Sequence, residues 1–176
     1  RMNPAGVVAS LAGLDQDARD KIMKLESNDD IFGAVVKKSN VVLGQAGYWD
    51  QLPNNAGKPF HKSVAVRKSS KDAAEPTEFL TNIPTLIRNL KVLEKGAKGV
   101  GMFSLNPSLD GIIREVPLVM KHEGFLYPAL SVEAIRVGLH VSTLMAEVND
   151  FGISAIGVAP KSKVKPKGLK IVTNEN

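Results

Sequence analysis

The stretch that decides the fold is residues 99–139, GVGMFSLNPSLDGIIREVPLVMKHEGFLYPALSVEAIRVGL. Two turn signals divide it: residues 106–111, which contain Asn-Pro and Asp-Gly, and residues 122–124, His-Glu-Gly. Proline presets φ and glycine accepts a positive φ, so both segments predict chain reversals. The expected order is strand, turn, strand, turn and helix, with an antiparallel hairpin around Asp110 and Gly111.

The second strand of this stretch is predicted from an alternation. Apolar and polar residues alternate from 114 to 121, which is the period-two pattern of a strand with one buried face. Pro117 interrupts the run and indicates a sheet edge or a bulge, because proline donates no ladder hydrogen bond. After Pro128 the apolar residues adopt a helical spacing, with Leu130, Ala134 and Val137 on one stripe.

The rest of the chain alternates helical and strand patterns. Helices are expected after Asp15 and from Asn28 or Asp29, the second with Phe32, Val35 and Val36 inward. A longer helical region is expected from Pro76 to Leu93, restarting near Asn82 and stopping at Gly96. Strands are expected at residues 41–43, 60–67 and 153–158. The pattern predicts an α/β fold, a mixed β-sheet flanked by helices.

Composition limits the classes of protein that fit. The 176 residues suit one domain, and 43% hydrophobic with 23% charged residues is ordinary globular composition. Absence of cysteine excludes disulfides and thiolate zinc sites, and no apolar run approaches the roughly 18 residues of a membrane helix. The net charge of +5 includes a lysine-rich segment at 161–170 without interleaved aromatics, so nucleic acid is not an expected partner.

The sequence lacks the spacings that are typical of metal sites and of common catalytic motifs. His61, His122 and His140 lack the short spacing of zinc ligands. No Gly-Lys-Ser/Thr phosphate loop, complete dinucleotide fingerprint or Gly-x-Ser-x-Gly element occurs. No metal, cofactor or catalytic residue is therefore expected.

A polar, glycine-rich and asparagine-rich segment at 45–58 contains the only tryptophan. It follows a predicted strand, and loops at the carboxyl ends of strands are where open α/β sheets usually bind ligands. Gln45, Tyr48, Trp49 and Asp50 are the candidate ligand-binding residues, because an aromatic pair with polar neighbours suits a small polar or cyclic molecule. The structural alternative is that the aromatics fold over the core as a lid.

Asp110 and Arg114 form the sharpest local motif. A carboxylate and a guanidinium across a tight turn can form a charge-assisted pair that stabilises the turn. Alternatively, the arginine can clamp an anionic ligand. The neighbouring Gly111 and Pro117 are already architectural, which favours the structural role.

These residues belong to a longer pattern. It consists of Gly101-x-Phe103-x-x-Asn106, Asp110-Gly111-x-x-Arg114-x-x-Pro117-Leu118 and Gly124-x-x-Tyr127-Pro128-x-Leu130-Ser131, preceded by Asn28-Asp29-Asp30-x-Phe32 and Val41-Val42-Leu43-Gly44. In order and spacing the pattern resembles the second type of CHASE domain, an extracellular sensory domain attached to nucleotide cyclases, histidine kinases and other signalling outputs. The structural motif residues on this basis are Asn106, Asp110, Gly111, Arg114 and Pro117.

The resemblance implies a non-catalytic sensor on the extracellular or periplasmic side of a cell-membrane protein. Residues 1–176 would be one sensor domain, truncated at both ends. Expected partners are a small-molecule or environmental cue, flanking transmembrane helices and a cytoplasmic output domain, with a homodimer because cyclase modules work in pairs in these families. An adenylate or guanylate cyclase is the favoured output and a histidine kinase the alternative. A small α/β enzyme with an unrecognised site is the alternative of a different class.

Overall fold

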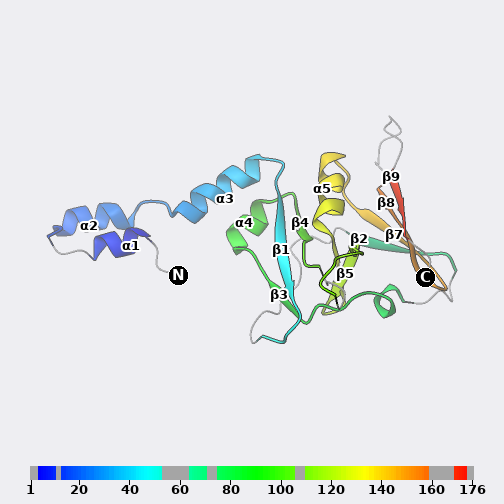
Figure 1. The fold of residues 1–176 in the computed structure, drawn as a ribbon. Helices are drawn as coiled ribbons and strands as arrows, with labels where there is room; N and C mark the ends of the chain where they lie inside the picture. Colours follow the sequence, from blue (N-terminus) through cyan, green and yellow to red (C-terminus); the bar gives the residue numbers. More distant parts are fainter. Residues whose placement is uncertain are drawn as a thin grey trace.

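Helices and strands alternate along the chain in the computed structural model (Figure 1). The structure describes residues 4–10, 13–52, 64–70, 75–105, 110–158 and 169–173. In chain order the elements are α1 (Pro4–Ala9), α2 (Gln16–Met23), α3 (Asn28–Lys38), β1 (Val42–Tyr48), β2 (Val64–Lys68), the 3₁₀ turn η1 (Pro76–Glu78), β3 (Thr85–Ile87), α4 (Lys91–Gly96), β4 (Gly99–Met102), β5 (Val119–His122), β6 (Phe125–Pro128), α5 (Leu130–Gly138), β7 (Leu144–Asn149), β8 (Gly152–Val158) and β9 (Leu169–Val172).

The strands of the described ranges form three sheets, in the orders β3-β1-β4, β2-β7-β8-β9 and β5-β6. The first sheet is mixed, because β1 pairs antiparallel with β3 and parallel with β4. The second is also mixed, since β2 and β7 are parallel and the remaining pairs antiparallel. Helix α5 packs on β4 and β1, and α4 packs on α3. The prediction of an α/β fold with a mixed β-sheet flanked by helices is confirmed.

The antiparallel hairpin predicted around Asp110 and Gly111 is wrong. Strand β4 pairs with β1 and strand β5 pairs with β6, so the strands on the two sides of Asp110 belong to different sheets. The connection between them spans residues 103–118, far longer than a tight hairpin loop. The hairpin lies at the second turn instead, where Glu123 and Gly124 have φ of 47° and 76°. A local turn signal does not specify which strands pair, because pairing depends on packing between distant elements.

The long helix predicted between Pro76 and Leu93 is also wrong. This region contains a single 3₁₀ turn, the short strand β3 and, only from Lys91, helix α4. Pro84 cannot donate a helical hydrogen bond. Its neighbours Ile83 and Leu86 are both buried, and they pack against Met102 from an extended backbone rather than from one face of a helix. The helical spacing of the apolar residues in this region therefore does not correspond to a helix.

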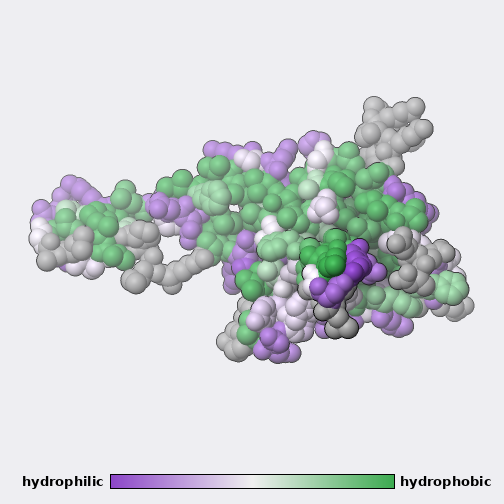
Figure 2. Space-filling view, viewed as in Figure 1, coloured by the Kyte–Doolittle hydropathy of each residue, from purple (hydrophilic) through white to green (hydrophobic). Residues whose placement is uncertain are grey.

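Helices α2 and α3 lie where the sequence predicted them, whereas α1 was not predicted. Asp15 caps α2 by accepting from the Ala18 N–H at 2.7 Å, whereas α3 is capped by Ser27 and not by Asn28 or Asp29. Of the α3 residues expected inward, Val36 is buried but Phe32 and Val35 are exposed. Figure 1 shows α1 and α2 projecting away from the sheets, and Figure 2 shows apolar surface along these helices.

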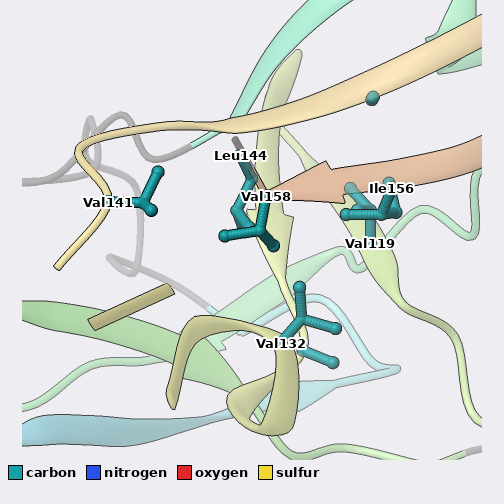
Figure 3. Close-up of a cluster of buried hydrophobic side chains, with 8 residues drawn as sticks. Val119, Val132, Val141, Leu144, Ile156 and Val158 are labelled. Carbon is teal, nitrogen blue, oxygen red and sulfur yellow. The ribbon is translucent and has the colours of Figure 1, made fainter. Parts of the chain in front are cut away.

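Helix α5 connects the two larger sheets. Its Val132 enters the main hydrophobic core together with residues of β5, β7 and β8 (Figure 3). The buried members of this core are Val119, Ala129, Val132, Val141, Leu144, Ala146, Ile156 and Val158. On the other sheet, a Cβ added at Gly101 would lie 2.6 Å from the Leu130 Cα. The start of α5 therefore lies directly on β4, and only glycine fits beneath it.

A buried ion pair fixes this helix. The Arg136 guanidinium donates to both carboxylate oxygens of Glu133, at 2.8 and 2.7 Å, and the Glu133 side chain is fully buried. The remaining N–H groups of Arg136 donate to the Val141 carbonyl at 2.7 Å and to the Lys98 carbonyl at 2.8 Å. Removing one partner of such a pair leaves an uncompensated buried charge.

We therefore expect Arg136→Met to lower the free energy of unfolding by about 3–5 kcal/mol, because the Glu133 carboxylate loses its bidentate partner in the interior. The matched control is Lys21→Met, which breaks an ion pair with Asp17 on the surface. Surface pairs contribute little, so the control should change stability by no more than about 0.5 kcal/mol. Urea unfolding of both variants measures the difference. Equal effects of the two substitutions would contradict the role assigned to the buried pair.

A second core cluster contains two polar atoms that lack a hydrogen-bond partner. Tyr127 packs with Ile83, Leu86, Met102 and Met120, and neither its hydroxyl nor the Nε2 of the adjacent His122 has a partner among the described residues. Burial raises the pKa of Tyr127 from its ordinary value of 10.0 to about 12. As pH rises, the unfolded chain therefore loses this proton first, and the folded state loses stability above pH 10.

Removing the Tyr127 hydroxyl should abolish this loss of folding stability at alkaline pH. Between pH 10 and 12 we expect the wild-type protein to lose roughly 2–3 kcal/mol relative to Tyr127→Phe, from a shift of about two pKa units. At pH 7 the variant should be at least as stable as wild type, because an unpaired buried hydroxyl is destabilising. Urea unfolding at several pH values, with tyrosine absorbance to follow ionisation, checks both. A parallel decline of the two proteins would contradict the assignment.

Candidate ligand-binding site

A pocket of about 260 Å³ lies at the carboxyl ends of β1 and β4. We call it the Trp49 pocket; the residues that line it are Trp49, Thr81, Ser104, Glu115, Val116 and Pro117. Trp49 directly follows β1, and Ser104 lies two residues beyond β4. These two strands are parallel, so their carboxyl ends lie together, which is where open α/β sheets bind ligands.

Two hydroxyl groups hold the segment that carries Trp49. The Ser104 hydroxyl accepts from the Gly47 N–H at 2.5 Å and donates to the Gly47 carbonyl at 2.9 Å. The Thr85 hydroxyl donates to the Asp50 carbonyl at 2.8 Å and accepts from the Leu52 N–H at 3.0 Å. The backbone is thus anchored before and after Trp49, which is one of the residues that line the pocket.

The four predicted ligand-binding residues have different positions. Trp49 lines the pocket and is 40% exposed. Tyr48 is the last residue of β1 and is exposed, while Asp50 is anchored through its backbone carbonyl. Gln45 lies in the core and its side-chain N–H donates to the Met102 sulfur at 3.3 Å. Of the four, only Trp49 is among the pocket-lining residues, and Gln45 belongs to the interior because β1 extends further than predicted.

The Asp110–Arg114 pair exists as a bidentate ion pair on the surface. Arg114 donates to the two Asp110 oxygens at 2.9 and 2.6 Å, and the Ile112 N–H donates to the same carboxylate at 3.1 Å. Hydrogen bonds from Arg114, and then from the Ile112 N–H, lower the pKa of Asp110 from its ordinary value. Gly111 between them has a φ of 77°. Asn106, another residue of the structural motif, lies outside the described residues.

The segment after this ion pair forms the far wall of the pocket. Glu115 and Val116 line it together with the motif residue Pro117. Sequence reasoning placed Glu115 on the solvent face of a strand and did not connect it with Trp49. In the structure β5 begins only at Val119. Residues 112–117 therefore lie outside a strand, and the last three of them line the pocket. The proline that interrupts the alternation was the available signal for this.

The histidines of the described ranges have structural positions. The His122 Nδ1 lies 2.7 Å from the Ile83 carbonyl, and His140 is exposed at the end of α5 with a φ of 54°. His61 lies outside the described residues. No group of three or more His, Cys, Asp or Glu residues in the described ranges is placed to hold a metal ion. Among the helices that the structure describes, none has the length and apolarity needed to cross a membrane.

Substitution of Gly111 tests whether the turn requires a residue that accepts a positive φ. No atom of the described residues lies within 4 Å of a Cβ built on Gly111, so the positive φ is the main obstacle to Gly111→Val. We expect a loss of about 1–3 kcal/mol in unfolding free energy, because a β-branched residue is strained there. Gly111→Asn is the matched control and should lose less, since asparagine tolerates the left-handed region. If thermal melts of the two variants coincide, the strain argument is wrong.

The chain was also compared with known proteins. No family model, no curated protein and no solved structure matches it. The resemblance to the second type of CHASE domain therefore rests on the motif residues and their spacing, and it stays a prediction.

Proposed function

We propose that this chain is the signal-input domain of a membrane-bound signalling protein and binds its cue in the Trp49 pocket. The observation on which this proposal depends is the position of the pocket. One wall follows the parallel strands β1 and β4, and the opposite wall is the segment from Glu115 to Pro117, which belongs to the CHASE-like motif. The motif residue Pro117 lines the pocket, and this position supports a ligand-reading role for the pocket.

The polar groups at the pocket hold the backbone of the segment after β1 in position. The Ser104 hydroxyl is bonded to both the N–H and the carbonyl of Gly47, whereas a nucleophilic serine needs a base within about 2.6–3.2 Å. Asp50 contributes a backbone carbonyl that accepts from Thr85, and this bond shapes the segment after β1. These contacts favour a site that holds a molecule over a site that converts it.

Strand β1 provides a path from the pocket to the N-terminal helices. Its carboxyl end leads into Trp49, and its amino end follows α3 after three residues (Figure 1). Helix α3 in turn packs closely on α4, since a Cβ at Gly96 would lie 2.9 Å from the Gly33 carbonyl oxygen. A ligand that binds better to one arrangement of the pocket walls shifts the balance of states. Through β1, such a shift would reach α3.

We place this domain on the extracellular or periplasmic side of its parent protein. Flanking transmembrane helices would carry the signal to a cytoplasmic output domain, most simply an adenylate or guanylate cyclase acting as a dimer. The resemblance of the 101–131 region to the CHASE pattern supports this arrangement. A histidine kinase in the cyclase's place would leave the input mechanism unchanged.

The proposal predicts the behaviour of a pocket variant in the full-length parent protein. Replacing Tyr48 and Trp49 by alanine should raise the half-maximal concentration of an effective cue by about tenfold or more, because it removes the aromatic side chain that lines the pocket, Trp49, together with its neighbour Tyr48. The melting temperature and the unstimulated output should stay near wild type, since both side chains are exposed. Output activity in membranes, measured across a panel of small-molecule cues, tests this.

Phe151→Ala is the matched control, because Phe151 is an exposed aromatic on the β7–β8 turn and does not line the pocket. It should respond as wild type does. If the Tyr48/Trp49 double variant also responds as wild type, the pocket is not the cue-reading surface. If deletion of residues 1–176 leaves regulation intact, the signal-input function itself is wrong.

A further inference from the structure

We infer that the Trp49 pocket recognises a small organic cation, with the Trp49 indole and the Glu115 carboxylate as the pair that binds an ammonium group. This inference rests on the proposed ligand-binding role of the same pocket. It follows from three properties of the lining residues: an aromatic side chain on a backbone segment that is anchored on both sides, an acid without an ion-pair partner among the described residues, and a limited volume with apolar contacts from Val116 and Pro117.

The aromatic group is suitably placed. Among aromatic side chains, tryptophan attracts cations most strongly over its ring face. Trp49 is 40% exposed and lies between the backbone anchors made by Ser104 and Thr85. Because the segment is already ordered, binding requires little further loss of conformational freedom.

Glu115 sets the charge of the pocket. Among the described residues that line the cavity it is the only ionisable one, and its carboxylate gives this part of the lining an acidic character. Within the described ranges, none of the observed ion pairs involves Glu115. Other acids are engaged there: Asp110 pairs with Arg114, Glu94 with Arg88, Glu133 with Arg136 and Glu147 with Lys170. The carboxylate of Glu115 is therefore available to a cation from solution.

A second pocket of the molecule has a different arrangement of charges. A cavity of about 250 Å³ beside β2 and β7 is lined by residues that include Arg67, Lys68 and Glu147. There the charges already neutralise one another, with Arg67 3.7 Å and Lys170 2.6 Å from the Glu147 carboxylate and Lys68 2.6 Å from Glu75. The Trp49 pocket, of similar size, combines an aromatic group with an acid that has no such partner in the part of the chain that the structure describes.

The remaining residues define the shape of the ligand. Val116 and Pro117 offer apolar contact for methyl or methylene groups, and Thr81 contributes a polar side chain at the rim. A volume of about 260 Å³ is roughly nine times that of a water molecule in the liquid, which suits an ammonium compound of a few carbon atoms. An anion would be repelled by Glu115, and a neutral molecule would partly desolvate the carboxylate without pairing it.

Trp49 is the only tryptophan of the chain, so its fluorescence reports directly on the pocket. The test titrates the 176-residue protein with choline, with n-butylammonium and with 3,3-dimethylbutan-1-ol, which has the shape of choline with carbon in place of nitrogen. We expect saturable changes with both cations and at least about tenfold weaker binding of the neutral alcohol. Calorimetry with the same probes provides a second measurement.

Charge-matched variants complete the test. Glu115→Gln should weaken choline binding about tenfold and leave the affinity for the neutral alcohol unchanged. Glu26→Gln removes an equal charge from an exposed position between α2 and α3, and it should bind choline as wild type does. Equal affinity for choline and the alcohol, no effect of Glu115→Gln, or no response to either cation would each overturn the inference.

The outcome also separates this inference from the proposed function. If choline binds at Trp49 but the output of the full-length protein does not respond to it or to the other cation, the cation site stands and the signal-input function fails. If the output responds through Trp49 only to neutral or anionic cues, the signal-input function stands and the cation inference fails.

Discussion

The bidentate pair between Glu133 and Arg136 is the interaction on which the rest of the structure depends. The Glu133 carboxylate is fully buried, and a buried charge is tolerated only when it is paired and hydrogen-bonded. Arg136 meets this requirement and also bonds the carbonyls of Lys98 and Val141. Those carbonyls precede β4 and β7, which belong to different sheets. One side chain therefore ties helix α5 to both sheets.

The position of α5 determines the geometry of the pocket. Because the helix starts directly over Gly101, β4 can approach α5 only with a residue that lacks a side chain at this position. This approach places β4 beside β1 in a parallel register, with Gln45 opposite Met102. The bonds between Ser104 and Gly47 then extend the pairing beyond the last residue of β4. The pocket edge thus depends on the packing of α5 against the same sheet.

Local chemistry was predictable from the sequence, and long-range pairing was not. The cap at Asp15, the Asp110–Arg114 pair and the positions of most strands follow from interactions between residues a few positions apart. The 76–93 region was misread because leucine and isoleucine at helical spacing also suit an extended segment that buries Ile83 and Leu86. The Asp-Gly turn was identified correctly, but the partners of the strands around it depend on elements far away in the chain.

The same distinction applies to the candidate site. Trp49 was predicted because an aromatic residue after a strand is a local signal, whereas Glu115 lies at the same pocket only through contacts between residues far apart in the chain. In that connection Asp110 and Arg114 neutralise each other, which leaves Glu115 as the uncompensated charge of the segment from 110 to 117. The paired residues and Gly111 shape the backbone, whereas Glu115, which has no ion pair with another described residue, is among the residues that line the cavity. The motif that shapes the wall and the residue that confers its charge are therefore separate, so the ligand preference of the pocket can change at Glu115 while the fold of the segment is preserved.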